Sequence, residues 1–122
     1  MPQTKVLIVD DEPAIRELFV DVLSAHGYQV FAAADGNSAI TVAERENPEV
    51  AFVDIRMPGM DGVELLGRLK AMSDKVRVVM ITGHGRDGAV ERALQLGTFA
   101  CLMKPFSVKD IVEMAEIVQL VA

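Results

Sequence analysis

Short apolar runs alternate along the chain with longer stretches in which apolar residues recur every three or four positions. Five of the short runs are rich in β-branched residues and lack polar alternation, which is typical of strands covered on both faces. They span residues 6–9, 29–33, 50–53, 77–81 and 100–103. The pattern therefore predicts five strands in a parallel sheet.

Helical periodicity fills the segments between and after these runs. The predicted helices span roughly residues 13–26, 36–46, 62–72, 87–96 and 107–120. Pro13 suits a first helical turn, Gly27 suits the position after a helix end, and Ser107 with Asp110 resembles a capping pair. Strands and helices alternate five times, so the expected fold class is α/β, a (βα)5 chain. Right-handed crossovers then produce a three-layer αβα sandwich.

Composition narrows the classes of protein that this chain can belong to. A length of 122 residues, with 51% apolar and 25% charged residues, predicts a single folded domain over 1–122. The net charge of −6 disfavours direct binding to nucleic acid or to an anionic membrane. A lone cysteine, Cys101, forms no intramolecular disulfide and fits a reducing cytoplasm. No apolar run is long enough for a signal peptide or a membrane span.

Chemically distinctive side chains follow four of the five predicted strands, and the carboxyl ends of parallel strands meet at one edge. These side chains are Asp10, Asp11, Asp54, Thr82 and Lys104. Three neighbouring carboxylates repel one another unless they bind protons or a divalent cation, and oxygen ligands favour Mg²⁺ or Mn²⁺ over zinc. Because Mg²⁺ shares its ligand shell with phosphate oxygens, we expect a phosphoryl substrate with Asp54 as its acceptor. Lys104 and Thr82 would then contact the phosphoryl oxygens.

Four motifs occur in order on the predicted strands. They are Leu-Ile-Val-Asp-Asp-Glu-Pro at 7–13, Val-Asp-Ile-Arg-Met-Pro-Gly-Met-Asp-Gly at 53–62, Ile-Thr-Gly-His-Gly at 81–85 and Leu-Met-Lys-Pro-Phe at 102–106. Together they make the chain resemble, over essentially its whole length, a response-regulator receiver domain of bacterial two-component signalling. The resemblance implies a flavodoxin-like, doubly wound sheet.

The resemblance also implies a function, that of a phosphorylation-dependent switch rather than a turnover enzyme. Asp54 would accept a phosphoryl group from the phosphohistidine of a sensor histidine kinase or phosphotransfer protein, or slowly from acetyl phosphate. Thr82 and Lys104 would read the phosphoryl group. The implied ligands of Mg²⁺ are Asp11, Asp54 and the backbone carbonyl of Arg56, with Asp10 acting through water. Residues two positions after the acceptor and the threonine, Arg56 and His84, are expected to set the lifetime of phosphorylated Asp54.

The route by which the signal leaves the domain departs from the family pattern. Cys101 stands where most receiver domains carry Tyr or Phe, and Phe99 is a candidate substitute on the same strand face. The resemblance implies an output surface on the fourth helix, fifth strand and fifth helix. Polar residues recur in the last helix only at 110, 113, 116 and 119, so its apolar arc is wider than one sheet contact needs. We therefore expect a partner surface that includes Val118 and Val121, in a homodimer or with an effector domain missing from this chain.

Three other functions fit the sequence less well. A metal-dependent phosphatase usually places its aspartyl nucleophile after the first strand with a second Asp two residues on, whereas Asp10 is followed by Asp11, Glu12 and Pro13. An FMN carrier needs Ser, Thr or Gly donors in the first loop, where these carboxylates would repel phosphate. A degenerate receiver domain that only docks partners would lack one of the metal or phosphoryl residues, and all of them are present here.

The two histidines, His26 and His84, are interpreted as solvated residues rather than metal ligands.

Overall fold

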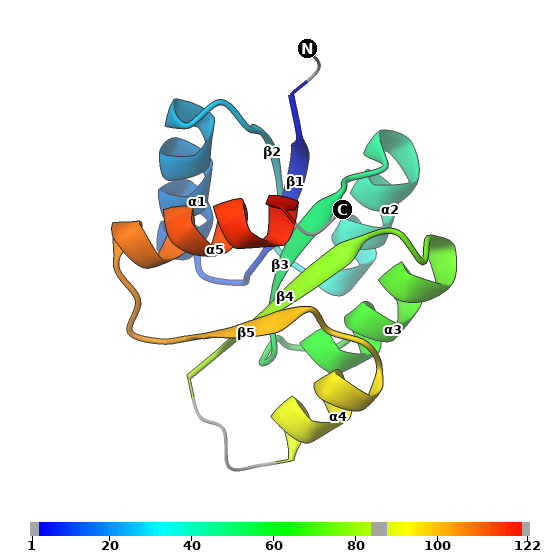
Figure 1. Cartoon of the computed structure of the whole chain (residues 1–122). Coiled ribbons are helices and arrows are strands. Elements are labelled where there is room, and N and C mark those ends of the chain that lie inside the picture. The colour runs from blue at the N-terminus through cyan, green and yellow to red at the C-terminus, as the bar shows by residue number, and fades with distance from the viewer. Residues whose placement is uncertain (1–2, 84–87, 121–122) are drawn as a thin grey trace.

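The computed structural model describes residues 3–83 and 88–120. Within these ranges, five parallel strands form one sheet in the order β2-β1-β3-β4-β5 (Figure 1). The strands are β1 (Lys5–Val9), β2 (Gln29–Ala33), β3 (Val50–Asp54), β4 (Arg77–Thr82) and β5 (Ala100–Met103). The helices are α1 (Pro13–Ala25), α2 (Gly36–Glu46), α3 (Gly62–Met72), α4 (Ala89–Gln95) and α5 (Val108–Leu120). The predicted (βα)5 fold with a parallel sheet is confirmed.

The element boundaries differ from the prediction by one or two residues. β3 and β4 each extend one residue further, so Asp54 and Thr82 are the last residues of their strands. His26 is the C-cap of α1, and the following Gly27 has a φ of +91°. α4 begins at Ala89, and the predicted start at Asp87 lies outside the described residues.

Helices cover both faces of the sheet, which confirms the three-layer sandwich (Figure 1). α1 and α5 pack on one face around Phe19, Phe52 and Ile111, and α2, α3 and α4 pack on the other around Leu66 and Met80. All residues of β3 are buried, and so are all of β1 and β4 except the first of each. Burial on both faces explains why these strands are unbroken apolar runs in the sequence.

Local capping interactions fix where two helices begin. The Ser107 backbone N–H donates to Asp110 Oδ2 at 2.9 Å, and the Asp110 N–H donates to Ser107 Oγ at 3.1 Å, so the predicted capping pair of α5 is confirmed. Asp61 caps α3 by accepting a hydrogen bond from the Glu64 N–H at 2.8 Å. This second cap ends the loop that follows β3 and defines the start of α3 beside Asp54.

The last helix buries one stripe and exposes another. Ile111, Ala115 and Val118 are inaccessible or nearly so, whereas Ile117 is 52% exposed and Leu120 is 82% exposed. The prediction that Val118 belongs to a partner surface is therefore wrong, because the spacing 111, 115, 118 places it on the face that contacts the sheet. Val121 lies outside the described residues.

Phe99 and Cys101 lie on opposite sides of the sheet. Phe99 packs against the apolar cluster beneath α1 and α5, and Cys101 packs against the cluster beneath α2, α3 and α4. The expectation that the two share a strand face is wrong, because β5 begins only at Ala100. Phe99 precedes it, with its backbone N–H donating to the Val78 carbonyl at 2.8 Å. Cys101 is half-buried, and burial raises the pKa of its thiol.

Of the helices in the described part of the chain, none combines the length and the apolar character that crossing a membrane requires.

Candidate functional site

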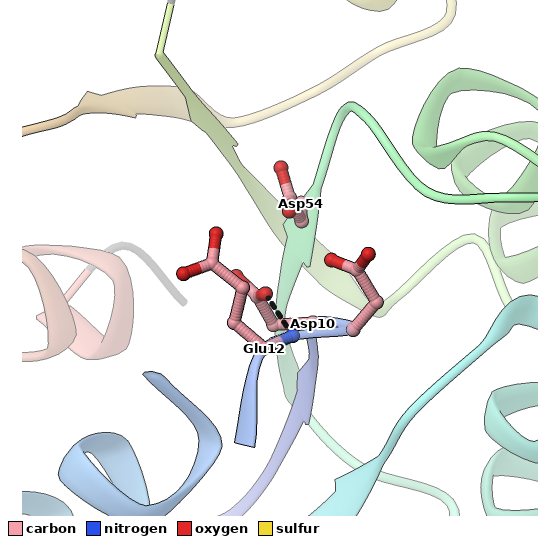
Figure 2. Close-up of side chains that lie close together, drawn as sticks. Asp10, Glu12 and Asp54 are labelled. Atoms are coloured by element: carbon pink, nitrogen blue, oxygen red, sulfur yellow. Dashed lines mark hydrogen bonds between the residues drawn. The ribbon is translucent and has the colours of Figure 1, made fainter. Parts of the chain in front are cut away.

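The loop between β1 and α1 presents the first carboxylates of the site (Figure 2). Asp10 directly follows β1 and is fully buried. Its Oδ1 accepts a hydrogen bond from the Glu12 backbone N–H at 2.9 Å, and its carbonyl accepts one from Arg16 Nη1 at 2.7 Å. Asp10 Oδ2 has no hydrogen-bond partner among residues 3–83 and 88–120. The two hydrogen bonds hold the loop in place, while Asp10 Oδ2, which is buried, is left to interact with a cation.

Asp54 ends the central strand β3 and is 4% exposed. Its Oδ1 accepts a hydrogen bond from the backbone N–H of Arg56, two residues on, at 3.2 Å. The loop returns past this point, because the Gly62 N–H donates to the Ile55 carbonyl at 2.9 Å. A Cβ atom at Gly62 would collide with the Asp54 backbone carbonyl. Glycine at this position therefore allows the start of α3 to pack directly against the end of β3.

Four carboxylates converge between these two strand ends. Asp10, Asp11, Glu12 and Asp54 each offer one oxygen, and these oxygens lie within 4.8 Å of one another. Asp10 and Asp54 are buried at the base of the cluster, and Asp11 and Glu12 are exposed at its rim. Figure 2 shows the side chains of Asp10, Glu12 and Asp54 at the carboxyl ends of β1 and β3. The cluster is open to solvent on one side, so a ligand could enter from there.

Lys104 supplies a positive charge from the far edge of the sheet. Its Nζ lies 3.4 Å from Glu12 Oε1, 3.7 Å from Asp54 Oδ2 and 3.8 Å from Asp10 Oδ2. Its backbone N–H donates to the Thr82 carbonyl at 2.8 Å. Thr82, at the end of β4, is 3% exposed. The ends of β4 and β5 are thereby joined directly to the acidic cluster.

Burial and mutual repulsion shift the ionisation of these groups. Desolvation raises the pKa of Asp10 to about 6, and the nearby Asp54 carboxylate adds to that rise. Desolvation also raises the pKa of Asp54, although Lys104 opposes the change. Burial lowers the pKa of Lys104, but Asp54, Asp10 and Glu12 outweigh that effect, so its net pKa is raised. The cluster therefore favours any bound species that adds positive charge.

The donor set fits a hard divalent cation. Every side-chain donor in the cluster is a carboxylate oxygen, which Mg²⁺ and Mn²⁺ prefer. Among the described residues, Asp10 Oδ2 accepts no hydrogen bond and has only the Lys104 ammonium at 3.8 Å. This oxygen and the mutual repulsion of the carboxylates both favour a cation in addition to Lys104.

The strand ends bring the predicted site residues together. The structure places these residues together at the carboxyl ends of the strands, as the parallel topology requires. They are Asp10, Asp11, Asp54, Thr82 and Lys104. Arg56 is exposed in the loop after β3. His26 lies outside the acidic cluster, with its Nδ1 2.9 Å from the Val22 carbonyl oxygen. His84 lies outside the described residues.

Sequence reasoning missed one member of the cluster, Glu12. An acidic residue at the start of a helix is ordinarily explained by the helix dipole, so its residue type alone did not indicate a role in the site. Its position directly after two strand-end aspartates was the clue, because the loop turns there and brings all three carboxylates to the same edge.

Comparisons with known proteins agree with this geometry. The model of the response regulator receiver domain family matches residues 6–116. Sporulation initiation phosphotransferase F of Bacillus subtilis is 37% identical over 111 residues, which cover 91% of this chain and 90% of that protein. The probable transcriptional regulator ycf27 of Porphyridium aerugineum is 36% identical, but the chain spans only 46% of its length.

Solved structures match this chain over nearly its whole length. The CheY-like response regulator receiver domain protein from Methanospirillum hungatei superposes with a TM-score of 0.92 at 30% identity, covering 98% of this chain and 96% of that chain. The chemotaxis protein CheY4 of Vibrio cholerae has a TM-score of 0.91 at 28% identity, covering 96% of this chain and 99% of that chain. The chain therefore belongs to the response regulator receiver domain family, the phosphoacceptor signalling modules of two-component systems.

Proposed function

We propose that Asp54 is the phosphoacceptor of this receiver domain and that its phosphorylation changes the surface formed by α4, β5 and α5. One observation carries the proposal. The buried Asp54 carboxylate lies among three further carboxylates, with the Lys104 ammonium 3.7 Å from its Oδ2. The phosphoryl donor would be the phosphohistidine of a sensor histidine kinase or of a phosphotransfer protein. The similarity to a sporulation phosphotransferase supports a partner of this kind.

In the proposed step, an Asp54 carboxylate oxygen attacks the phosphorus atom of the phosphohistidine. The new O–P bond forms as the P–N bond breaks, and its electron pair returns to the imidazole nitrogen. Asp11, Asp54 and the Arg56 carbonyl would hold Mg²⁺, or alternatively Mn²⁺, with Asp10 acting through water. A bound divalent cation would neutralise the charge that develops on the phosphoryl oxygens. Lys104 would contribute a further positive charge from the side of β5.

After transfer, Thr82 and Lys104 would bind oxygens of the phosphoryl group. The Lys104 N–H already donates to the Thr82 carbonyl, so movement of either residue is transmitted between β4 and β5. The surface expected to change comprises α4, β5 and α5. Its exposed apolar side chains include Met103, Ile117 and Leu120. We propose that this surface binds a second copy of the domain or an effector domain. We also propose that residues 1–122 act as one receiver unit and that the protein works in the cytoplasm.

A phosphate-affinity gel tests the acceptor. Treatment with acetyl phosphate and Mg²⁺ should produce a retarded band with the unmodified protein and none with Asp54→Asn. Asp61→Asn is the matched control, because Asp61 is an exposed carboxylate of the same loop and asparagine also caps helices. A retarded band that persists in Asp54→Asn would contradict the assignment.

Sedimentation tests the output surface. With Mg²⁺ and beryllofluoride, which mimic phosphorylation, the homodimer form of the proposal predicts association that weakens in Ile117→Glu/Leu120→Glu. A protein that stays monomeric under these conditions would reject the homodimer and favour an effector domain as the partner.

A further inference from the structure

Glu12 does not use its side chain as a helix cap. It is the N-cap residue of α1, yet its carboxylate makes no capping hydrogen bond. N-cap positions favour Ser, Thr, Asp and Asn because their short side chains accept hydrogen bonds from the first helical N–H groups. Glu12 instead accepts a hydrogen bond from Lys104 Nζ at 3.4 Å, across 92 positions of the sequence. Its carboxylate therefore serves the site rather than the helix.

A local partner for Glu12 is present but is used elsewhere. Arg16 stands four residues after Glu12, the spacing at which an acidic residue followed by a basic one pairs well on a helix. The Arg16 guanidinium donates at 2.7 Å to the Asp10 carbonyl and so supports the loop beneath the acidic cluster. The arrangement thus directs Glu12 toward Lys104.

The three carboxylates around Lys104 differ in their access to water. The Asp10 and Asp54 side chains are 0% and 6% exposed, whereas the Glu12 side chain is 60% exposed and lies closest to Nζ. An ion pair with a solvated carboxylate is weak, because water replaces the lost partner easily. Lys104 is therefore held by the carboxylate that can release it most readily.

We propose that Glu12 is a positioning residue, which holds the Lys104 ammonium while Asp54 is unphosphorylated and releases it to the phosphoryl group. This inference rests on the proposed function of Asp54. Glu12 then opposes phosphorylation by keeping Lys104 engaged in the resting state. Removing its charge makes Lys104 available and favours the phosphorylated form.

The resting contact is tested without metal or phosphoryl chemistry. The ¹⁵N resonance of the Lys104 ammonium, assigned by its loss in Lys104→Met, should shift in Glu12→Gln. Glu17→Gln removes the same charge from an exposed position further along α1 and should leave that resonance unchanged. A Lys104 resonance that is unaffected by Glu12→Gln would overturn the contact.

The consequence is tested by a double-mutant cycle on beryllofluoride binding, followed by ¹⁹F NMR at saturating Mg²⁺. Glu12→Gln should raise the affinity about threefold, the scale of one exposed ion pair. Part of any gain could arise from direct repulsion between Glu12 and the anion, which does not involve Lys104. In the Lys104→Met background, Glu12→Gln should therefore have much less effect, because the residue through which Glu12 acts is absent.

The possible failures are distinguishable. An equal gain in both backgrounds, or no gain in either, would overturn the positioning role while leaving Asp54 as the acceptor. Failure of the unmodified protein to bind beryllofluoride would overturn the proposed function and this inference together.

Discussion

The centre and the outer edge of this sheet depart from ordinary residue partitioning in opposite ways. At the centre, Asp10 directly follows β1 and Asp54 ends β3, and these carboxylates are 0% and 4% exposed. At the edge, β5 and α5 expose the apolar side chains of Met103 and Leu120, at 58% and 82%. Burying charge and exposing large apolar side chains are both unfavourable for an isolated fold. Under the proposed function, a cation with a phosphoryl group would bind at the acidic centre, and an apolar partner would cover the edge.

Lys104 joins the two regions. Its backbone follows β5, where Met103 is exposed, and its ammonium lies within 4.0 Å of three carboxylates of the central cluster. A change of charge at Asp54 would therefore act first on the residue that directly follows the outer strand. The apolar edge is thus connected to the acidic centre through Lys104, although the side chains of one region are apolar and those of the other are acidic.

The largest expected effect separates the inner and outer faces of α5. Val118→Glu places a charge in the fully buried stripe and should lower the free energy of unfolding by about 4 kcal/mol. The neighbouring Ile117→Glu, on the exposed face, should change it by less than about 1 kcal/mol. Urea denaturation measures both. Equal losses in the two variants would show that α5 does not have one inner and one outer face.

The second effect concerns the acidic centre. At a Mg²⁺ concentration a hundred times its dissociation constant, the free energy of unfolding should rise by about 2.7 kcal/mol. Asp11→Ala should remove most of this rise and stabilise the metal-free protein, because one of the mutually repelling carboxylates is gone. Asp74→Ala, an exposed carboxylate in the loop before β4, is the control and should keep the full response. A full Mg²⁺ response in Asp11→Ala would contradict the metal assignment.

The same contrast explains what could be predicted from the sequence. The central strands are covered on both faces, so their unbroken apolar runs predicted the strands, and the parallel topology then predicted that Asp10, Asp54 and Lys104 meet. The edge was harder to predict. On α5 the apolar arc is so wide that periodicity alone cannot tell Val118, which faces the sheet, from Ile117, which does not.

The other features that the sequence did not predict correctly also lie near the ends of helices or strands. The strand face of Phe99 depended on where β5 begins, a boundary that only the tertiary structure determines. The role of Glu12 depended on a contact with Lys104 across 92 positions, for which the local sequence holds no signal.

A third prediction tests the support of Asp54 within one helix. Gly62→Ala should cost about 2 kcal/mol, because its Cβ would collide with the Asp54 backbone carbonyl. Gly67→Ala, later in α3, meets its nearest atom at 3.9 Å and should instead stabilise the protein, since alanine favours helices over glycine. Thermal unfolding compares the two variants. Stabilisation by both would mean that α3 does not pack directly on the end of β3.

The smallest expected effect is a pH dependence at the buried centre. Desolvation raises the folded-state pKa of Asp10 to about 6, so folding favours its protonated form. The corresponding stabilisation is fully present below the ordinary aspartate pKa and is lost as the pH rises through about 6. In metal-free buffer, the free energy of unfolding should therefore fall between pH 5 and 7.5 by about 1 kcal/mol more in the unmodified protein than in Asp10→Asn. Asp35→Asn is the control, because a hydrogen bond from Ser38 lowers the pKa of that exposed carboxyl, which places its titration below this window. If Asp10→Asn and the unmodified protein showed the same pH dependence, folding would not raise the pKa of Asp10. Burial at the centre of the sheet would then not disfavour the charged form of this carboxyl.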